Sequence, residues 1–295
     1  MTRSSAQVTA LVPTKNEAVN LERCLLALSR AGSVIVVDSG STDGTVEIAR
    51  KCDAEVVQFV YRGGYPKKRQ WAIDNLEITT GWILLVDADE VVTPELWGEI
   101  ECAVAQNHFS AFIAKKQFHF MGRRFRFGGF SHRAVVLIRK GAARFEQLSA
   151  ELDVGLDMEV HERLIVDGPI GRLRAPLRHE DFKGLEAYID RHNRYSSWEA
   201  AAREEILRQR GPDREILRPS LTGDLQRRRR LLKKLAARVL FEPTLWFLYH
   251  FVLMGGFLEG RRGLIASQMR FAYIAQVRAK MYERKLARIA AARQA

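Results

Sequence analysis

Apolar and polar positions alternate in blocks along the N-terminal part of the chain. Short runs of β-branched or aliphatic residues occupy positions 8–13, 33–38, 54–59 and 82–87. Such runs are typical of buried parallel strands. The segments between them have apolar residues at helical spacing, at positions 18–29, 43–52 and 68–76. This β-α-β-α-β-α-β order predicts an α/β fold with a doubly wound sheet, whose ligands gather at the carboxyl ends of the strands.

The pattern changes after Phe109. Up to about His179 it consists of short strand-like pieces, and the loop at residues 121–130 is rich in arginine, aromatic residues and glycine. Residues 185–209 have a helical pattern, and the remainder after Gly211 and Pro212 is helical as well. We therefore expect two domains, an α/β domain at residues 1–202 and a helical extension at residues 203–295.

Charge separates these two parts of the chain. The whole sequence has 47 basic and 35 acidic residues, a net charge of +12. Residues 1–202 contain 26 basic and 27 acidic side chains, whereas residues 203–295 contain 21 basic and only 8 acidic ones. A segment with such an excess of basic residues is expected to bind a polyanion, either nucleic acid or the anionic headgroups of a membrane.

The neighbours of the basic residues favour the membrane. The basic run at residues 227–234 is followed by an aromatic, apolar stretch at residues 245–258. Only 16 residues lie between Glu242 and Glu259, fewer than the roughly 20 that a membrane-spanning helix needs. We expect residues 224–262 to lie on an anionic membrane surface, with a core helix of the C-terminal domain as the alternative. No zinc-finger or RNP-like motif follows the basic run, so no nucleic-acid partner is expected.

Acidic and hydroxyl residues cluster where the predicted strands end. Asp87 and Asp89 follow the most apolar strand, and two carboxylates at a rigid strand end can share a hard cation and its phosphate ligand. The loops at residues 13–17 and 38–45 bring more acids and hydroxyls to the same edge.

The three loops together resemble glycosyltransferase family 2, nucleotide-sugar transferases with the GT-A fold. The similar motifs are V-P-T-K-N-E, V-V-D-S-G-S-T-D-G-T and L-L-V-D-A-D-E. Segments at residues 128–130, 160–163, 167–171 and 191–196 are similar to the bacterial subgroup that includes lipopolysaccharide-core β-1,4-glucosyltransferases. The resemblance implies a Rossmann-like, mostly parallel sheet flanked by helices, followed here by the basic helical extension.

The resemblance also implies a donor site. Glu17 and Asp38 match the family's acids near uracil and ribose, with Pro13 and Thr14 lining that end of the pocket. Asp87 would lie by the ribose. Its neighbour Asp89 would bind Mg2+ or Mn2+ at the diphosphate, which offsets charge on the departing UDP.

Three further positions follow from the same resemblance. Lys68 or Arg69 would supply a cation for the diphosphate, although Gln70-Trp71 departs from the family's usual sequence. His179 matches the late histidine of the fold, which can reach the same metal as Asp89. The general base is expected at Glu162, in Val160-His161-Glu162. Its rivals are Asp153, Asp157 and Glu159, in a stretch that is an insertion relative to the family.

These features predict an inverting, metal-dependent glycosyltransferase at the cytosolic face of the cell membrane. It would move a hexose, glucose as first choice, from a UDP-sugar to a lipid-linked glycan acceptor such as lipopolysaccharide core. A polyprenyl-linked repeat unit or a lipid is the alternative acceptor. A non-catalytic membrane-surface protein on the same fold is the remaining alternative.

Overall fold

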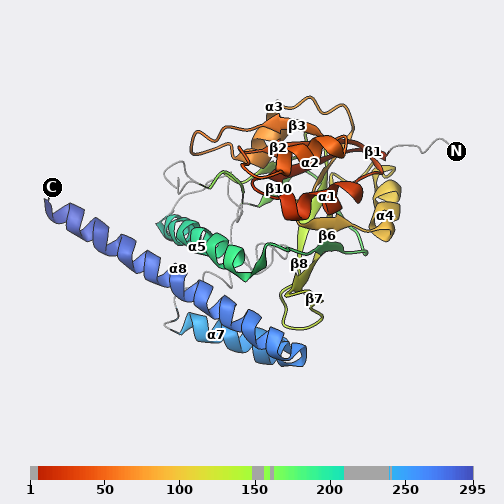
Figure 1. The fold of residues 1–295 in the computed structure, drawn as a ribbon. Coiled ribbons are helices and arrows are strands. Elements are labelled where there is room, and N and C mark those ends of the chain that lie inside the picture. The colour runs from red at the N-terminus through yellow and green to blue at the C-terminus, as the bar shows by residue number, and fades with distance from the viewer. Residues whose placement is uncertain (1–5, 148–155, 160–162, 209–238, 240, 295) are drawn as a thin grey trace. The chain divides into compact units, whose positions relative to one another are not determined.

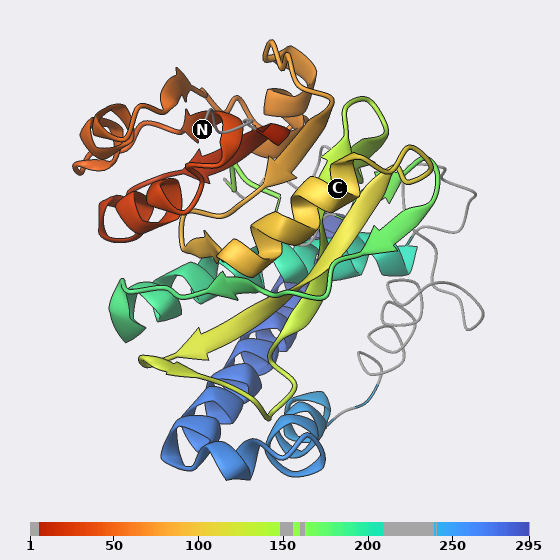
Figure 2. The same cartoon turned by 90° about the vertical axis from the view of Figure 1, so that its right-hand side faces the viewer.

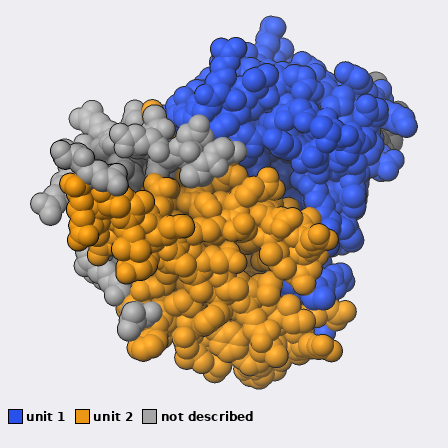
Figure 3. All heavy atoms as spheres, turned by 60° about the vertical axis from the view of Figure 1, so that its left-hand side comes forward, with its two compact units in different colours: residues 1–125, 131–145, 157–184 blue, residues 126–130, 146–156, 185–295 orange. Residues whose placement is uncertain are grey.

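The computed structural model describes residues 6–147, 156–159, 163–208, 239 and 241–294. Two compact units make up the chain (Figure 3). Unit 1 contains Met1–Phe125, Ser131–Phe145 and Asp157–Gly184, and unit 2 contains Arg126–Phe130, Glu146–Leu156 and Leu185–Ala295. The predicted domain boundary at residues 202–203 lies within one helix, α5 (Gly184–Arg208).

Unit 1 is built on a ten-stranded sheet (Figures 1 and 2). Its main path runs in the order β3-β2-β1-β4-β8-β6-β12-β5, and β7 and β11 pair with β6. The strands are β1 (Ala6–Thr14), β2 (Ala31–Asp38), β3 (Glu55–Gln58), β4 (Trp82–Leu85), β5 (Glu90–Val92), β6 (Ala111–Phe120), β7 (Arg123–Arg124), β8 (His132–Arg139), β11 (Ile170–Arg172) and β12 (Leu177–His179). A separate antiparallel pair joins β9 (Ala143–Phe145) to β10 (Leu164–Val166).

The four strands expected from the apolar runs form the parallel half of this sheet. β1 pairs in parallel with β2 and β4, and β2 pairs in parallel with β3. Beyond β4 the sheet is mixed, because β8 runs antiparallel to both β4 and β6. The predicted α/β fold class, a Rossmann-like sheet flanked by helices, is confirmed.

Helices cover both faces of the parallel strands. Successive side chains of a strand point to opposite faces, so each strand contributes apolar residues to both layers. On one face Val8, Ala10 and Val12 of β1 pack with α1 (Ala18–Leu26), α2 (Thr45–Lys51) and α4 (Pro94–Val104). On the other face Leu11 of β1 packs in one cluster with Ala72 of α3 (Lys68–Asn75). Each strand is therefore apolar on both sides, which explains the unbroken apolar runs in the sequence.

Unit 2 is helical in its described part, as the C-terminal pattern predicts. It contains α5, α7 (Glu242–Leu248), a π-helical turn η2 (Tyr249–Leu253), a 3-10 turn η3 (Gly256–Glu259) and α8 (Arg261–Gln294). Its apolar centre includes Ala200 from α5 and Tyr273, Ile274 and Val277 from α8. No helix among the described residues has the length and hydropathy required to cross a bilayer.

Candidate active site

The polar loops after β1, β2 and β4 meet at one edge of the sheet. The three strands are parallel and adjacent, and Thr14 at the end of β1 is the register partner of Asp38 at the end of β2. Asp87 and Asp89 follow the end of β4. Carboxyl ends of parallel strands at this position form the ligand-binding edge of doubly wound sheets.

Asp38 is fixed by hydrogen bonds at this edge. Its carboxylate accepts from the Thr14 hydroxyl at 3.0 Å, from the Ser41 backbone N–H at 2.8 Å and from the Ser41 hydroxyl at 2.5 Å. Burial alone would raise the pKa of Asp38, but these hydrogen bonds outweigh burial and lower it. Pro13 is buried one residue before Thr14. The predicted residues Pro13, Thr14 and Asp38 therefore lie together, with a charged carboxylate held in one orientation.

Glu17 lies at the start of α1 and is held by neighbours of its own. Its carboxylate accepts from Lys183 Nζ at 2.6 Å and from Asn20 Nδ2 at 3.0 Å. Burial raises its pKa, and the contact with Lys183 opposes that shift. The ion pair ties the loop after β1 to the segment that follows β12.

Asp87 belongs to a cluster of two acids and two cations. It pairs with the guanidinium of Arg69 and lies 3.0 Å from Lys116 Nζ, which in turn lies 2.7 Å from Oε1 of Glu90. Glu90 also accepts from the backbone N–H of Asp87 at 2.9 Å. Burial would raise the pKa of Asp87, but the charges of Arg69 and Lys116 outweigh it and hold that pKa well below its usual range. Asp87 is therefore an ionised, oriented acceptor.

Asp89, in the turn between β4 and β5, lies close to His179 at the end of β12. His179 Nδ1 lies 3.3 Å from Asp89 Oδ1 and 3.7 Å from Glu90 Oε1. This nitrogen is buried and makes no hydrogen bond within the described part of the chain. Burial alone would lower the pKa of His179, but the charge of Asp89 outweighs it and raises that pKa to about 9. The acids around His179 thus favour its positively charged form.

Lys68, one of the two predicted diphosphate cations, is buried inside unit 1. Its ammonium donates to the Thr14 carbonyl at 2.7 Å and pairs with Asp157 at 3.0 Å. Burial lowers the pKa of Lys68, and the Asp157 charge opposes that shift. Lys68 therefore connects the loop after β1 to the segment around Asp157.

The expected general base, Glu162, and its rival Asp153 lie outside the described residues. The other two rivals are engaged in internal contacts. Asp157 pairs with Lys68, and Glu159 accepts from the backbone N–H groups of Arg69 at 3.1 Å and Gln70 at 2.9 Å. These two N–H groups belong to the first turn of α3, which lacks intrahelical partners, so Glu159 caps that helix.

Comparison with known proteins gives a family match for residues 9–149. The Glycosyl transferase family 2 profile matches residues 9–149, which include all three loops. Residues 9–149 therefore match a family 2 glycosyltransferase domain. A lipopolysaccharide core biosynthesis glycosyltransferase, LpsC of Rhizobium meliloti, is 25% identical over 94% of this chain and 92% of its own length. An uncharacterised glycosyltransferase of Rickettsia bellii is 38% identical, over 37% of this chain and 36% of its own length.

Solved structures add a weaker likeness. A mannosyltransferase of Pyrobaculum calidifontis, solved with GDP-Man and Mn2+, is 17% identical and covers 94% of this chain and 87% of its own, with a TM-score of 0.47. S. aureus TarS 1-349, solved with UDP-GlcNAc, is also 17% identical, covers 94% and 88%, and has a TM-score of 0.46. Similarity at this level does not assign a ligand to the glycosyltransferase domain described here.

The carboxylate of Asp89 and the imidazole of His179 fit a divalent cation that is bound by two protein ligands. Adjacent ligands of an octahedral ion lie roughly 3 Å apart, close to the 3.3 Å between Asp89 Oδ1 and His179 Nδ1. No group of three or more such ligands occurs among the residues that the structure describes. A carboxylate and an imidazole would leave further positions for oxygens of a diphosphate or water.

Two cations of this edge were missed by the sequence reasoning. Lys116 lies within β6, where it stands next to Lys115 and Gln117 and belongs to no motif of the family. Lys183 lies in the segment after β12, and no sequence motif marks it. Both are paired with residues that the family resemblance does identify, Asp87 and Glu17.

Proposed function

We propose that this glycosyltransferase transfers a hexose, with glucose as the first candidate, from a UDP-sugar to a membrane-borne glycan acceptor such as lipopolysaccharide core. The observation that carries the proposal is the meeting of Asp89 and His179 at the strand edge that also holds Asp38 and Asp87. The acceptor class is supported by the Rhizobium meliloti relative, whose name refers to lipopolysaccharide core biosynthesis.

Different charged residues would bind different parts of the UDP-sugar. Asp38 is an oriented acceptor for hydroxyl or amide hydrogens of the nucleoside, with Thr14 and Pro13 beside it and Glu17 on the neighbouring helix start. Asp87 is held ionised by Arg69 and Lys116 and accepts from the ribose. Lys68 or Arg69 would supply the positive charge that balances a diphosphate.

Asp89 and His179 would hold Mg2+ or Mn2+. Bound there, the cation would offset negative charge that develops on the leaving diphosphate. Nδ1 of His179 is buried and lies 3.3 Å from Asp89 Oδ1, close to the spacing of two neighbouring ligands of one ion.

Glu162 is proposed as the general base. It would accept the proton of the acceptor hydroxyl as that oxygen bonds to the anomeric carbon, while the bond from that carbon to the UDP oxygen breaks. The displacement inverts the anomeric configuration. The capping role of Glu159 and the ion pair of Asp157 support Glu162, because these two of its three rivals are engaged in internal contacts.

The proposed location is the cytoplasm, peripheral on the inner face of the cell membrane, where both a UDP-sugar and a lipid-linked glycan are accessible. The proposed attachment segment is residues 224–262. Of these, 224–238 and 240 lie outside the described residues.

Transfer of labelled glucose from UDP-glucose to detergent-extracted envelope glycolipid tests the proposal. Wild-type protein should label the lipid with an inverted, β-configured glucose. Glu162→Gln should still bind UDP-glucose but transfer it far more slowly. Labelling of a polyprenyl-linked glycan instead would leave the enzyme chemistry in place and change the acceptor.

A further inference from the structure

One face of α7 and η2 in unit 2 exposes apolar side chains. They recur three or four residues apart, which places them along one side of the helix. The exposed residues of this face are Phe241, Leu245, Leu248, Tyr249, Val252 and Leu253. Leu253 is 77% exposed and Phe241 67%. The exposure continues into η3 at Phe257 and Leu258. We call this set of eight residues the apolar face. A contiguous exposed apolar surface of this kind is typical of an interaction site.

Both acidic residues of this segment are turned inward. Glu242 is completely buried, where it accepts from Arg203 Nη1 at 2.9 Å and from Arg278 Nη1 at 3.3 Å. Glu259 is buried as well, and its carboxylate accepts from the backbone N–H groups of Arg126 at 2.6 Å and Phe127 at 2.9 Å. Residues 241–262 are described throughout, and no carboxylate of theirs is exposed.

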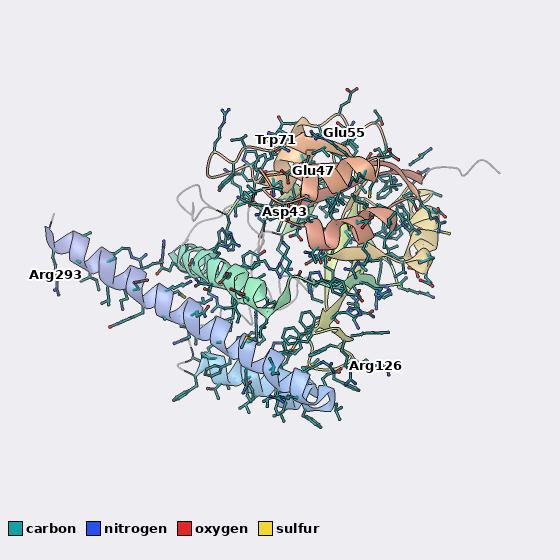
Figure 4. The ribbon with its side chains drawn as sticks, viewed as in Figure 1. Asp43, Glu47, Glu55, Trp71, Arg126 and Arg293 are labelled. Carbon is teal, nitrogen blue, oxygen red and sulfur yellow. The ribbon has the colours of Figure 1, made fainter. Side chains whose placement is uncertain are left out.

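Cations accompany the apolar face. Arg261 and Arg262 are exposed at the start of α8, directly after η3. Arg126, labelled in Figure 4, is exposed beside the exposed ring of Phe127. The loop that carries them is fixed to η2 and its end, since Gly128 N–H donates to the Met254 carbonyl at 2.8 Å and His250 Nδ1 lies 2.6 Å from the Gly128 carbonyl oxygen. This part of unit 2 therefore exposes apolar and cationic groups without acids.

We propose that the apolar face inserts shallowly into an anionic lipid bilayer, with Arg126, Arg261 and Arg262 at the level of the lipid phosphates. The inference rests on the proposed function in one respect, namely that insertion would bring the enzyme to a membrane-borne acceptor. Apolar rings and aliphatic side chains beside arginines match the acyl boundary and headgroup layer of a bilayer. A second copy of this chain is a poorer occupant, because twofold pairing would bring the same arginines together with no exposed acid of this segment to pair with them.

Co-sedimentation with vesicles tests this proposal on the full chain. The vesicles contain phosphatidylcholine and phosphatidylglycerol in a 3:1 ratio, or phosphatidylcholine alone. Wild-type protein should bind the anionic vesicles, and Leu253→Glu should lower the partition coefficient by at least roughly tenfold, because a charge replaces an inserted leucine. Phe257→Glu should give the same loss. The matched control is Leu26→Glu, which changes a leucine that is 64% exposed in unit 1 and should bind as wild type does.

The arginines provide a second arm of the test. Arg261→Gln combined with Arg262→Gln should weaken binding at low salt by roughly fivefold for each charge. Wild-type protein should keep part of its vesicle binding in 0.5 M NaCl, because insertion of apolar side chains is not screened by salt. Leu253→Glu should lose this salt-resistant part of the binding.

Other outcomes would overturn the proposal. Equal vesicle binding by Leu253→Glu, Phe257→Glu and wild type would overturn it. So would a wild-type dimer in analytical ultracentrifugation that Leu253→Glu converts to a monomer with no change in vesicle binding. UDP release from a UDP-sugar in detergent is measured in parallel and should be unchanged in Leu253→Glu. Loss of vesicle binding with this activity intact separates the membrane inference from the proposed enzymatic function.

Discussion

Replacement of Lys116 by methionine tests how the donor edge is held together. Lys116 Nζ lies 2.7 Å from Glu90 Oε1 and 3.0 Å from Asp87 Oδ2. The methionine side chain keeps most of the aliphatic length and removes the charge. Asp87 retains Arg69 as a partner, but Glu90 loses its close cation while it remains completely buried.

The expected cost follows from this geometry. At an effective dielectric constant of about 20, each contact of Lys116 has a Coulomb energy of roughly 6 kcal/mol before desolvation is subtracted. Removal of one partner from a buried ion pair destabilises proteins by about 3–5 kcal/mol. Burial already raises the pKa of Glu90, so this carboxyl can take up a proton when Lys116 is absent. We therefore expect Lys116→Met to lower the free energy of unfolding by about 3 kcal/mol, the lower end of this range.

Differential scanning calorimetry at pH 7 measures the effect. At roughly 2–4 °C per kcal/mol, Lys116→Met should lower the melting temperature of the transition that contains unit 1 by about 6–12 °C. Lys116→Arg, which keeps the charge, serves as the matched control and should lose much less. The double variant Lys116→Met with Glu90→Gln should regain part of the loss because no buried charge is left unpaired. A melting temperature within about 2 °C of wild type in Lys116→Met, or no recovery in the double variant, would refute the reasoning.

Three other variants test separate parts of the structure. Glu159→Ala should destabilise the protein to urea by about 1–2 kcal/mol, since α3 loses its cap, and an unchanged midpoint would show that Glu159 does not stabilise the helix. Gly263→Ala places a Cβ 1.9 Å from the carbonyl oxygen of Gly256 and should cost about 1–3 kcal/mol in the same assay, whereas wild-type stability would contradict the close packing of η3 on α8. Glu162→Gln should reduce sugar transfer by roughly 10²–10⁴-fold with UDP-sugar binding retained by calorimetry, and unchanged transfer would assign the base elsewhere.

The sequence was sufficient to predict the parallel half of the sheet because each strand there contains a short run of aliphatic residues, such as Trp82–Leu85 of β4. β1, β2, β3 and β4 each overlap the predicted segments, and Thr14, Asp38 and Asp87 meet because parallel strands end at one edge. The antiparallel insertion of β8 between β4 and β6 depends on long-range pairing, and local periodicity carries no information about it.

The partners of the site residues were harder to predict than the residues themselves. Lys116 pairs with Asp87 across 29 positions of sequence, and Lys183 pairs with Glu17 across 166. Such pairs arise from tertiary packing, which no local motif encodes. The inward orientation of Glu242 and Glu259 was equally hidden, since the sequence shows two acids bordering an apolar stretch but not which way they point.

Metal-dependent UDP release tests the central claim most directly. Purified full-length protein is supplied with a panel of UDP-sugars, Mg2+ or Mn2+, and detergent-extracted envelope lipids. Asp89→Ala is compared with Glu101→Ala, which removes a partly exposed acid of α4 that pairs with Arg30, directly before the amino end of β2. The account predicts release from one donor that requires metal, increases with the lipid extract, disappears in Asp89→Ala and persists in Glu101→Ala. Full activity in Asp89→Ala, or no release from any UDP-sugar by the wild type, would contradict it.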